Sequence, residues 1–249
     1  MRELRHGLID RIASRVTGLS ASVASPSIAD NRALLEELGQ PACMAELLRQ
    51  VRADRPTLRA VAARSYPHVN QFDKIVLVGS PDRAAYRLTL HLWEGRYSED
   101  QTGEELIHDH RFNFWSVVLA GALVSQPFEG SESGKAYRRY RYFPETFRGR
   151  SFSEIYEFTG DTKLRATACT TRTRSESYFL SAENIHRIVL QPARLTCSLV
   201  LRGPRLRRYS CVYNTTYPAE TARISSAMFS EEQLDAKLAN LLREVEAPP

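Results

Sequence analysis

Ile107-His108-Asp109-His110 is the stretch of sequence that decides the fold. If it lies on a β-strand, successive side chains alternate between two faces, so His108 and His110 point the same way. Both imidazoles then reach one metal ion, and a third imidazole from another strand would still leave positions open for a substrate. His186, far downstream, is the candidate for that third ligand. Neutral nitrogen ligands with open positions suit catalytic iron, nickel, copper or zinc better than a closed structural site does.

The sequence around this stretch changes from a helical period to a strand period and back. Leu8, Ile12 and Val16 begin a series of apolar repeats at three- and four-residue spacing, which predicts helices up to about residue 65. Asp30 is the expected cap of the second helix. Ser230 precedes an apolar stripe that is typical of an amphipathic helix. We therefore expect a helical extension (1–65), a β-barrel (66–215) and a C-terminal segment with one helix (216–249), all within a single structural domain.

Between these helical parts, short runs of period two predict a sandwich or barrel of many strands. The expected strands are Lys74–Val78, Ala85–Trp93, Leu106–His110, Phe114–Ser125, Ala136–Phe143, Phe152–Phe158, Leu164–Thr171, Ser177–Leu180, Ile185–Leu190, Leu195–Arg202 and Leu206–Val212. Glycine-containing turns are expected between them at residues 79–82, 129–131, 160–161 and 203–204.

The composition is that of a globular protein with enough apolar residues to form a core. The chain has 249 residues, of which 43% are hydrophobic and 25% charged. Its cysteines are widely spaced and form no CxxC pair, which argues against a disulfide scaffold and fits a reducing cytosol. The N-terminus lacks the apolar run of a signal peptide, and no apolar run is long enough to span a membrane. We therefore expect a cytoplasmic protein with no membrane partner.

Basic residues give a net charge of +5, and several of them cluster with tyrosines in residues 138–142, Arg-Arg-Tyr-Arg-Tyr. Arginine interleaved with tyrosine is compatible with a nucleic-acid surface. The alternative is the solvated face of strands, which we favour, so a nucleic-acid partner is not our expectation. The sequence carries no clear signature of oligomeric state.

Two motifs resemble those of the cupin family. His108-Asp109-His110, followed by the apolar run from Trp115 to Gly121, resembles the first cupin motif, and the sequence 183–187, Glu-Asn-Ile-His-Arg, resembles the second. Most cupins add a glutamate ligand shortly after the HxH pair, but residues 111–115 contain no carboxylate. The chain is therefore most similar to the three-histidine variant, as in cysteine dioxygenase and related thiol dioxygenases, over about residues 60–215.

This resemblance implies an all-β core in the form of a cupin barrel (a double-stranded β-helix, or jelly roll) with helices at both ends. It also implies a mononuclear non-haem metal site in which His108, His110 and His186 hold Fe(II). A thiol substrate and O2 would bind there side by side. Ni(II) or Cu(II) stays open as an alternative, because three imidazoles suit each of these ions.

The resemblance is weaker around the substrate. The family's arginine for the substrate carboxylate corresponds to Lys74, a cation without the bidentate fork, and Arg87 is a second candidate. Arg202 replaces a tyrosine of the family's relay near the metal. Trp115 replaces the cysteine that many members cross-link to a tyrosine, so that cross-link should be absent. The metal ligands thus match the family while the substrate-binding residues do not.

Further candidates follow from strand faces. His91 shares a face with Arg87 and Trp93. If that face points inward, Trp93 lines the cavity and His91 is available for acid–base catalysis, because its pKa lies near neutrality; otherwise His91 is a core histidine. Arg202 is either an inward anchor for a carboxylate, sulfonate or phosphate or a surface charge. Phe72 and Trp115 are expected as apolar walls, with a core role as the alternative.

The predicted function is that of a metal-dependent dioxygenase that inserts O2 into a small thiol or amino-acid-like substrate, a specialised one such as those of secondary metabolism. Its partners are then the small-molecule substrate and O2. Two alternatives stay open: a metal-dependent cupin without redox chemistry, such as an isomerase or lyase, and a basic module that associates with nucleic acid.

Overall fold

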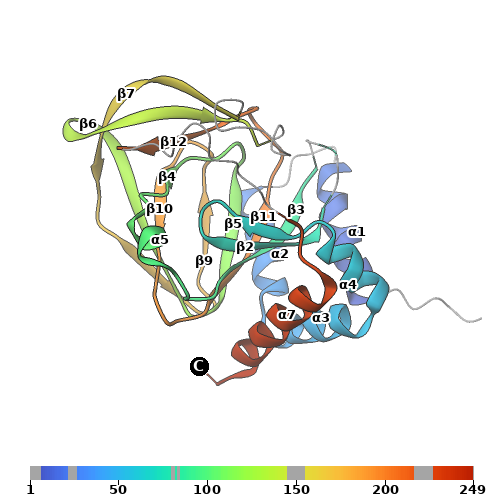
Figure 1. Cartoon of the computed structure of the whole chain (residues 1–249). Helices are drawn as coiled ribbons and strands as arrows, with labels where there is room; N and C mark the ends of the chain where they lie inside the picture. The colour runs from blue at the N-terminus through green and yellow to red at the C-terminus, as the bar shows by residue number, and fades with distance from the viewer. Residues whose placement is uncertain are drawn as a thin grey trace, which may run out of the picture.

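The computed structural model describes residues 7–21, 27–79, 82, 85–144, 155–215 and 227–248. Figure 1 shows its two parts, a group of helices on one side and two layers of strands on the other. The helices are α1 (Leu8–Ala21), α2 (Ile28–Leu38), α3 (Pro41–Ala53), α4 (Arg55–Ala62), α5 (Glu99–Gly103) and α7 (Glu231–Glu246).

The strands form two six-stranded sheets that are entirely antiparallel. The first sheet runs in the order β1 (Tyr66–His68), β2 (Phe72–Val78), β3 (Arg87–Trp93), β11 (Thr196–Arg202), β5 (Phe114–Ala120) and β9 (Ser177–Leu180). The second runs in the order β10 (Ile185–Val189), β4 (Ile107–His108), β12 (Ser210–Asn214), β6 (Ala122–Tyr142) and β7 (Tyr156–Ala166), and β8 (Thr170–Thr173) pairs with β6.

The first sheet lies between the helices and the second sheet. Successive side chains along its strands alternate between the face that packs on the helices and the face that lines the cavity. On β3, Leu88, Leu90 and Leu92 point to the helices and join the largest hydrophobic core. Their neighbours on the same strand, from Arg87 to Trp93, point to the cavity between the sheets. Each fully buried leucine contributes about 1.5–3 kcal/mol to folding, so the helix-covered face holds most of the apolar stabilisation. The cavity face is left free for polar side chains.

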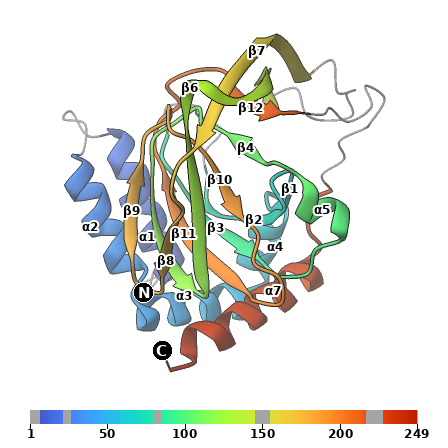
Figure 2. The ribbon, with the colours of Figure 1, turned by 90° about the vertical axis from the view of Figure 1, so that its left-hand side faces the viewer.

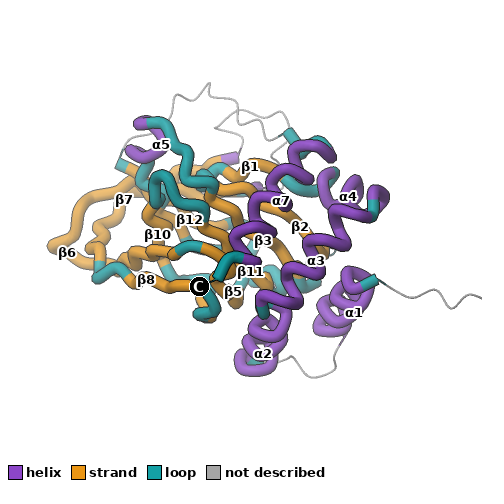
Figure 3. The backbone as a smooth tube through the Cα atoms, turned by 90° about the horizontal axis from the view of Figure 1, so that it is seen from below, coloured by secondary structure: helices purple, strands orange, loops and turns teal. Residues whose placement is uncertain are grey.

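Helix α7 closes this core from the C-terminal end of the chain. Ser230 caps it in a capping box with Gln233, and its apolar stripe, which includes Leu234 and Leu238, is fully buried. The helix packs on α3 and α4, and Arg52 of α3 forms an ion pair with Asp235 at 2.8 Å. Figure 3 shows α7, α3 and α4 side by side on one side of the strands. The predicted cap and stripe of this helix are thus confirmed.

Several predicted boundaries are wrong in detail. The second helix is capped by Ser27, and Asp30 is the third residue of its capping box rather than the cap. The predicted strand Phe114–Ser125 is divided at Gly121, which adopts a φ of +71°. The turns predicted at residues 129–131 and 160–161 lie inside β6 and β7, where shifts of register take up the extra residues. Phe152, Ser80 and Pro81, which belong to other predicted boundaries, lie outside the described residues.

The two sheets face each other around a cavity, with β4 and β10 of the second sheet opposite β2, β3 and β11 of the first (Figure 2). This is the cupin barrel, with helices before and after it, that the sequence predicted. Among the described residues, no helix is both long enough and apolar enough to cross a membrane.

Candidate metal centre

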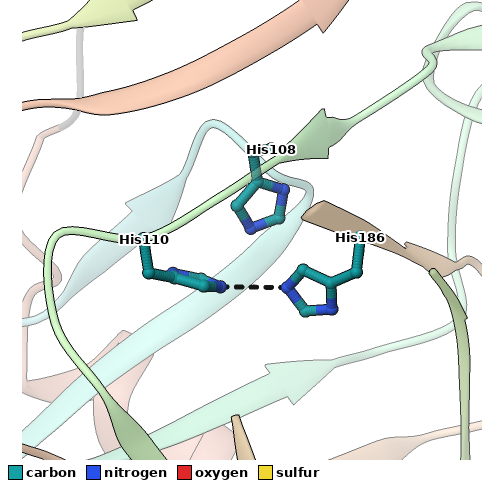
Figure 4. A group of neighbouring side chains, drawn as sticks. All are labelled: His108, His110 and His186. Carbon is teal, nitrogen blue, oxygen red and sulfur yellow. Dashed lines mark hydrogen bonds between the residues drawn. The ribbon is translucent and has the colours of Figure 1, made fainter. Parts of the chain in front are cut away.

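Three histidine side chains converge inside the barrel. His108 on β4 lies directly opposite His186 on β10 in the antiparallel register, so their side chains share one face. His110 follows the end of β4, and its backbone N–H donates to the carbonyl of Ala182 at 2.9 Å. One ring nitrogen from each histidine lies within 4.8 Å of the others (Figure 4). The predicted convergence is therefore observed, although the strand that carries the pair ends at His108.

Hydrogen bonds to the outer ring nitrogens favour Nε2 as the metal-binding atom. Nδ1 of His108 lies 2.8 Å from the carbonyl oxygen of Leu106, and Nδ1 of His186 lies 3.3 Å from the hydroxyl of Ser125. A hydrogen bond at one nitrogen fixes the tautomer and leaves the other nitrogen free as a ligand. The Nε2 atoms of His110 and His186 lie only 2.9 Å apart. Two nitrogens bound to one ion at ~2.1 Å are about 3.0 Å apart at a right angle.

Burial keeps these imidazoles neutral. Loss of solvent lowers the pKa of His110 and His186 well below the usual value, and repulsion by neighbouring histidines adds to the effect. Burial also lowers the pKa of His108, while the hydrogen bond to Leu106 opposes the change. Neutral imidazole is the form that binds metal. The donor set therefore fits a divalent ion of the kind that nitrogen ligands prefer.

Asp109, between the two histidines, has a structural task. Its Oδ1 accepts hydrogen bonds from the backbone N–H of Cys211 at 2.5 Å and from Arg207 at 2.7 Å. Arg207 also donates to the carbonyl of His110 at 2.6 Å. These bonds attach the HxH segment to β12 and to the loop before it. Asp109 is not within the group of possible ligands, in agreement with the expectation that it points away from the two imidazoles.

The histidines open on a cavity of about 560 Å³. This volume lies within the usual range for sites that bind small molecules. The predicted site residues that line it are Phe72, Lys74, Arg87, His91, Trp93, Arg202, His108, His110 and His186. Those of the first sheet face the cavity because paired residues on the neighbouring strands β2, β3 and β11 point to the same face of the sheet.

The structure contradicts the predicted position of Trp115 in the cavity wall. It lies on the opposite face of β5, where its ring belongs to the core beneath the helices and its indole N–H donates to the carbonyl of Ile28 at 3.0 Å. Phe114, one position earlier, supplies the cavity wall instead. The HxH motif does not predict which residues of β5 face the cavity, because residues 109–113 form a loop and side-chain direction does not alternate regularly through it. The predicted role of Trp115 as a wall of the site is therefore wrong.

Basic side chains dominate one end of the cavity. Burial, with repulsion from Arg87 and Arg202, lowers the pKa of Lys74 to about 7. Burial likewise lowers the pKa of Arg202 to about 9, with repulsion from Arg87 and other arginines adding to it. Arg202 donates to the carbonyl of Ala85 at 2.7 Å, and its guanidinium lies over the ring of Phe112. Among the lining residues, Asp109 supplies a carboxylate, which Arg207 already pairs.

Aromatic rings form a second wall. Phe72 lies between His68 and His91, with ring centroids 4.5 and 4.3 Å away, and Trp93 is 5.2 Å from Phe72. Burial lowers the pKa of His91 well below its usual value, and Lys74 and His108 lower it further. His91 is therefore a neutral imidazole in the cavity wall, and a weaker base than the near-neutral pKa expected from the sequence would make it. Its role in catalysis stays a prediction.

Sequence reasoning missed several cavity residues. Tyr66, His68 and Asn70 enter from β1 and the turn that follows it, while Arg111 and Tyr178 enter from the loop after the HxH motif and from β9. The period-two pattern of His68, Phe72 and Lys74 was the available signal for the first group. Asn70 lies in a turn, where no periodic pattern could have shown its direction.

The arginine–tyrosine cluster divides between two faces of β6. Tyr140 and Tyr142 are buried, and Tyr142 stacks on Tyr156 with a centroid distance of 4.9 Å. Arg141 is half-buried and forms an ion pair with Glu157 at 3.5 Å. Because Tyr140 and Tyr142 are buried, their rings are not exposed for stacking with nucleic-acid bases.

Comparisons with known proteins add little about chemistry. No protein-family model matches the sequence, and no curated protein matches it. Among solved structures, the polyketide cyclase RemF from Streptomyces resistomycificus is similar at 15% identity and a TM-score of 0.33, over 61% of this chain and 75% of that one. Hydroquinone 1,2-dioxygenase PnpCD, in complex with Cd2+ and 4-hydroxybenzonitrile, is similar at 12% identity and 0.30, over 52% and 63%. Hydroxypropylphosphonic acid epoxidase from S. wedmorenis is similar at 11% and 0.30, over 78% and 94%. These values transfer no activity to the chain.

Proposed function

We propose that the protein is a mononuclear, metal-dependent dioxygenase that acts on a small anionic substrate, with a thiol as the group that is oxidised. The observation that carries the proposal is the convergence of His108, His110 and His186 at the wall of a cavity. Three neutral nitrogen ligands leave positions free for substrate and O2, and this fits Fe(II) best, with Ni(II) or Cu(II) as alternatives.

Lys74, Arg87 and Arg202 would bind the anionic end of the substrate. All three line the cavity, and they come from adjacent strands of the first sheet, opposite the strands that carry the histidines. A guanidinium binds a carboxylate, sulfonate or phosphate through paired hydrogen bonds, and an ammonium acts as a point charge. An anion placed among these cations would relieve their mutual repulsion. The substrate would then lie with its charged end at the first sheet and its reactive end toward the histidines.

A bound iron ion would supply the redox chemistry, and the reaction balances without a further reductant. Addition of one O2 to a thiol, R–SH, gives a sulfinic acid, R–SO2H, so that all four oxidising equivalents of O2 are used by sulfur. The neutral imidazole of His91 would accept a hydrogen bond from the bound substrate. The wall of Phe72 and Trp93 would keep water from the reacting groups.

Oxygen uptake tests this proposal. Protein loaded anaerobically with one equivalent of Fe(II) is mixed with cysteine and with larger carboxylated, sulfonated or phosphorylated thiols, and O2 consumption is compared with the sulfinate that forms. We expect one O2 consumed for each sulfinate with at least one thiol. A His186→Ala variant with the same amount of iron corrects for oxidation by free iron. No uptake above that control with any thiol would contradict thiol oxygenation. Turnover without O2 would instead favour an isomerase or lyase.

A further inference from the structure

The cations at one end of the cavity come from three neighbouring strands. Lys74, Arg87 and Arg202 lie on β2, β3 and β11 of the first sheet, and all three line the cavity. Among the described lining residues, Asp109 is the one carboxylate, and its Oδ1 already pairs with Arg207 at 2.7 Å. The described lining therefore carries more positive than negative charge.

Two of these cations are placed side by side by the strand register. Arg202 lies directly opposite Arg87 in the antiparallel pairing of β11 with β3, so both side chains point to the same face of the sheet. Like charges in such opposite positions repel each other and destabilise the pair. An anion that entered the cavity beside them would be attracted by both guanidinium groups.

Arg202 is oriented by the protein and still has a donor for a ligand. The residue is only 4% exposed, its Nη2 donates to the carbonyl of Ala85 at 2.7 Å, and its Cζ lies 5.1 Å from the centroid of the Phe112 ring. Its buried Nε has no hydrogen-bond partner among the described residues. Buried donors without a partner are rare in folded proteins. This N–H is therefore available to an acceptor that binds in the cavity.

Lys74 and Tyr66 add a second charge and a hydroxyl donor. They are paired across β2 and β1, and both line the cavity. Burial lowers the pKa of Lys74 to about 7, and the charges of four arginines lower it further. Those arginines are Arg87, Arg202, Arg111 and Arg205. Burial raises the pKa of Tyr66, and the charges of the same four arginines oppose this change. The ammonium and the hydroxyl thus lie in the field of the same guanidinium groups.

This group of cations lies close to the candidate metal ligands. The ring of Phe112 contacts both, since its centroid is 5.1 Å from Cζ of Arg202 and 5.6 Å from the ring centroid of His110. A ligand that bound to Arg202 and also reached the histidines would span few bonds. The cavity volume of about 560 Å³ likewise suits a small molecule. Such a molecule has room for one compact charged group besides its reactive end.

We propose that Arg202, Arg87 and Lys74 bind a doubly charged tetrahedral group, a phosphate monoester or a phosphonate, and that the substrate is a small phosphorylated or phosphonylated molecule. A phosphate monoester has three acceptor oxygens and about 1.5 to 2 negative charges at pH 7, whereas a carboxylate has two oxygens and one charge. Three oxygens can accept from donors on three strands, and two charges neutralise more of the repulsion than one does. The inference rests on the proposed function only in treating this cavity as the substrate site.

Methyl phosphate and methyl sulfate are the probes, because they have nearly the same shape but carry about two and about one negative charge at pH 7. Each is titrated calorimetrically into metal-free protein, so that neither anion can bind through a metal ion. We expect methyl phosphate to bind at least about tenfold more tightly, a difference of about 1.4 kcal/mol. Malonate, whose two charges lie on separate carboxylates, should bind more weakly than methyl phosphate.

Arg202→Gln and Lys74→Met each remove one positive charge from the site and keep most of the side-chain length. Each should weaken methyl phosphate binding about tenfold, as expected for the loss of a hydrogen bond between charged groups, and should weaken methyl sulfate binding less. Arg165→Gln is the matched control. It removes the same charge from an exposed side chain of β7 that pairs with Glu129, and it should leave both affinities unchanged.

Melting of the metal-free proteins shows which variants fold, and Lys74→Met carries the comparison if Arg202→Gln does not fold. Equal affinity of the parent for methyl phosphate and methyl sulfate, or binding of neither, would overturn the inference. So would tighter binding of malonate, or a preference for methyl phosphate that the folded variants keep in full. These titrations involve no thiol, O2 or metal. Phosphate binding without any O2 uptake would therefore support this inference and contradict the proposed oxygenase alone.

Discussion

Lys74 is the residue whose chemistry the fold changes most. Burial, together with repulsion from Arg87 and Arg202, lowers its pKa from 10.5 to about 7. Between these two values the unfolded chain holds a proton that the folded chain has lost. Stability therefore rises with pH over this window, and the full cost of the buried charge is present below pH 7. A cost of this kind is retained where a cation is needed for function.

Replacement of Lys74 by methionine should stabilise the metal-free protein. The variant keeps most of the side-chain volume and removes the repelled cation, so at pH 6 we expect a gain of about 1–2 kcal/mol, discounted for water in the cavity. The gain should shrink toward pH 10. Urea unfolding of parent and variant at several pH values measures it. A difference between the two proteins that stays constant from pH 6 to pH 10 would contradict the pKa of Lys74 given above.

At this scale the sequence predicted the histidines better than their surroundings. The spacing of His108 and His110 was informative because side-chain direction repeats over two residues, and backbone bonds keep that direction even past the end of β4. Trp115 was misplaced because its phase depends on how β5 pairs with β11 and β9, and no local pattern sets that pairing. Asn70 was missed because it lies in a turn, where side-chain direction follows no periodic pattern.

Among the elements, the junction of β5 and β6 shows how one glycine sets a boundary. Gly121 has a φ of +71°, and a Cβ at this position would lie 2.3 Å from the carbonyl oxygen of Leu195 and 2.7 Å from Oγ1 of Thr196. The chain can therefore pass from one sheet to the other only without a side chain here. An apolar run on both sides hid this break from the period-two pattern, although the glycine itself was the signal.

Gly121→Ala should destabilise the protein, because it adds both an unfavourable φ and contacts with backbone atoms that cannot move away. We expect a loss of at least about 2 kcal/mol in the free energy of unfolding. Gly130→Ala is the matched control on β6, since its Cβ meets open space and its φ is not positive. Thermal and urea unfolding of both variants tests the account. Equal stability of the two variants would mean that Gly121 does not set the boundary.

The length of β6 is the other feature that the sequence could not give. It continues for 21 residues through a predicted turn, because pairing with β7 and β8 on one side and with β10 and β12 on the other holds it extended. The helices were easier to predict, since a buried stripe such as that of α7 is a local property. Long-range pairing decides strand ends, and local propensity does not.

For the whole molecule, the two sheets contribute different residues to the site. The second sheet supplies the three histidines, and the first supplies cations and aromatic rings while its other face carries the main core. The sequence predicted a barrel and its metal ligands from motifs and periodicity. The cavity volume of about 560 Å³ and the identity of its far wall depend on how the sheets pack, which no single stretch of sequence contains.

Metal binding by the protein is the most direct test of the central claim. Protein stripped of metal is titrated calorimetrically with Co(II), in parallel with a variant in which His108, His110 and His186 are all alanine. Circular dichroism shows that the variant folds. We predict one tightly bound ion per chain for the parent and none for the variant. A folded variant that binds the ion as tightly as the parent, or a parent that binds none, would contradict the account.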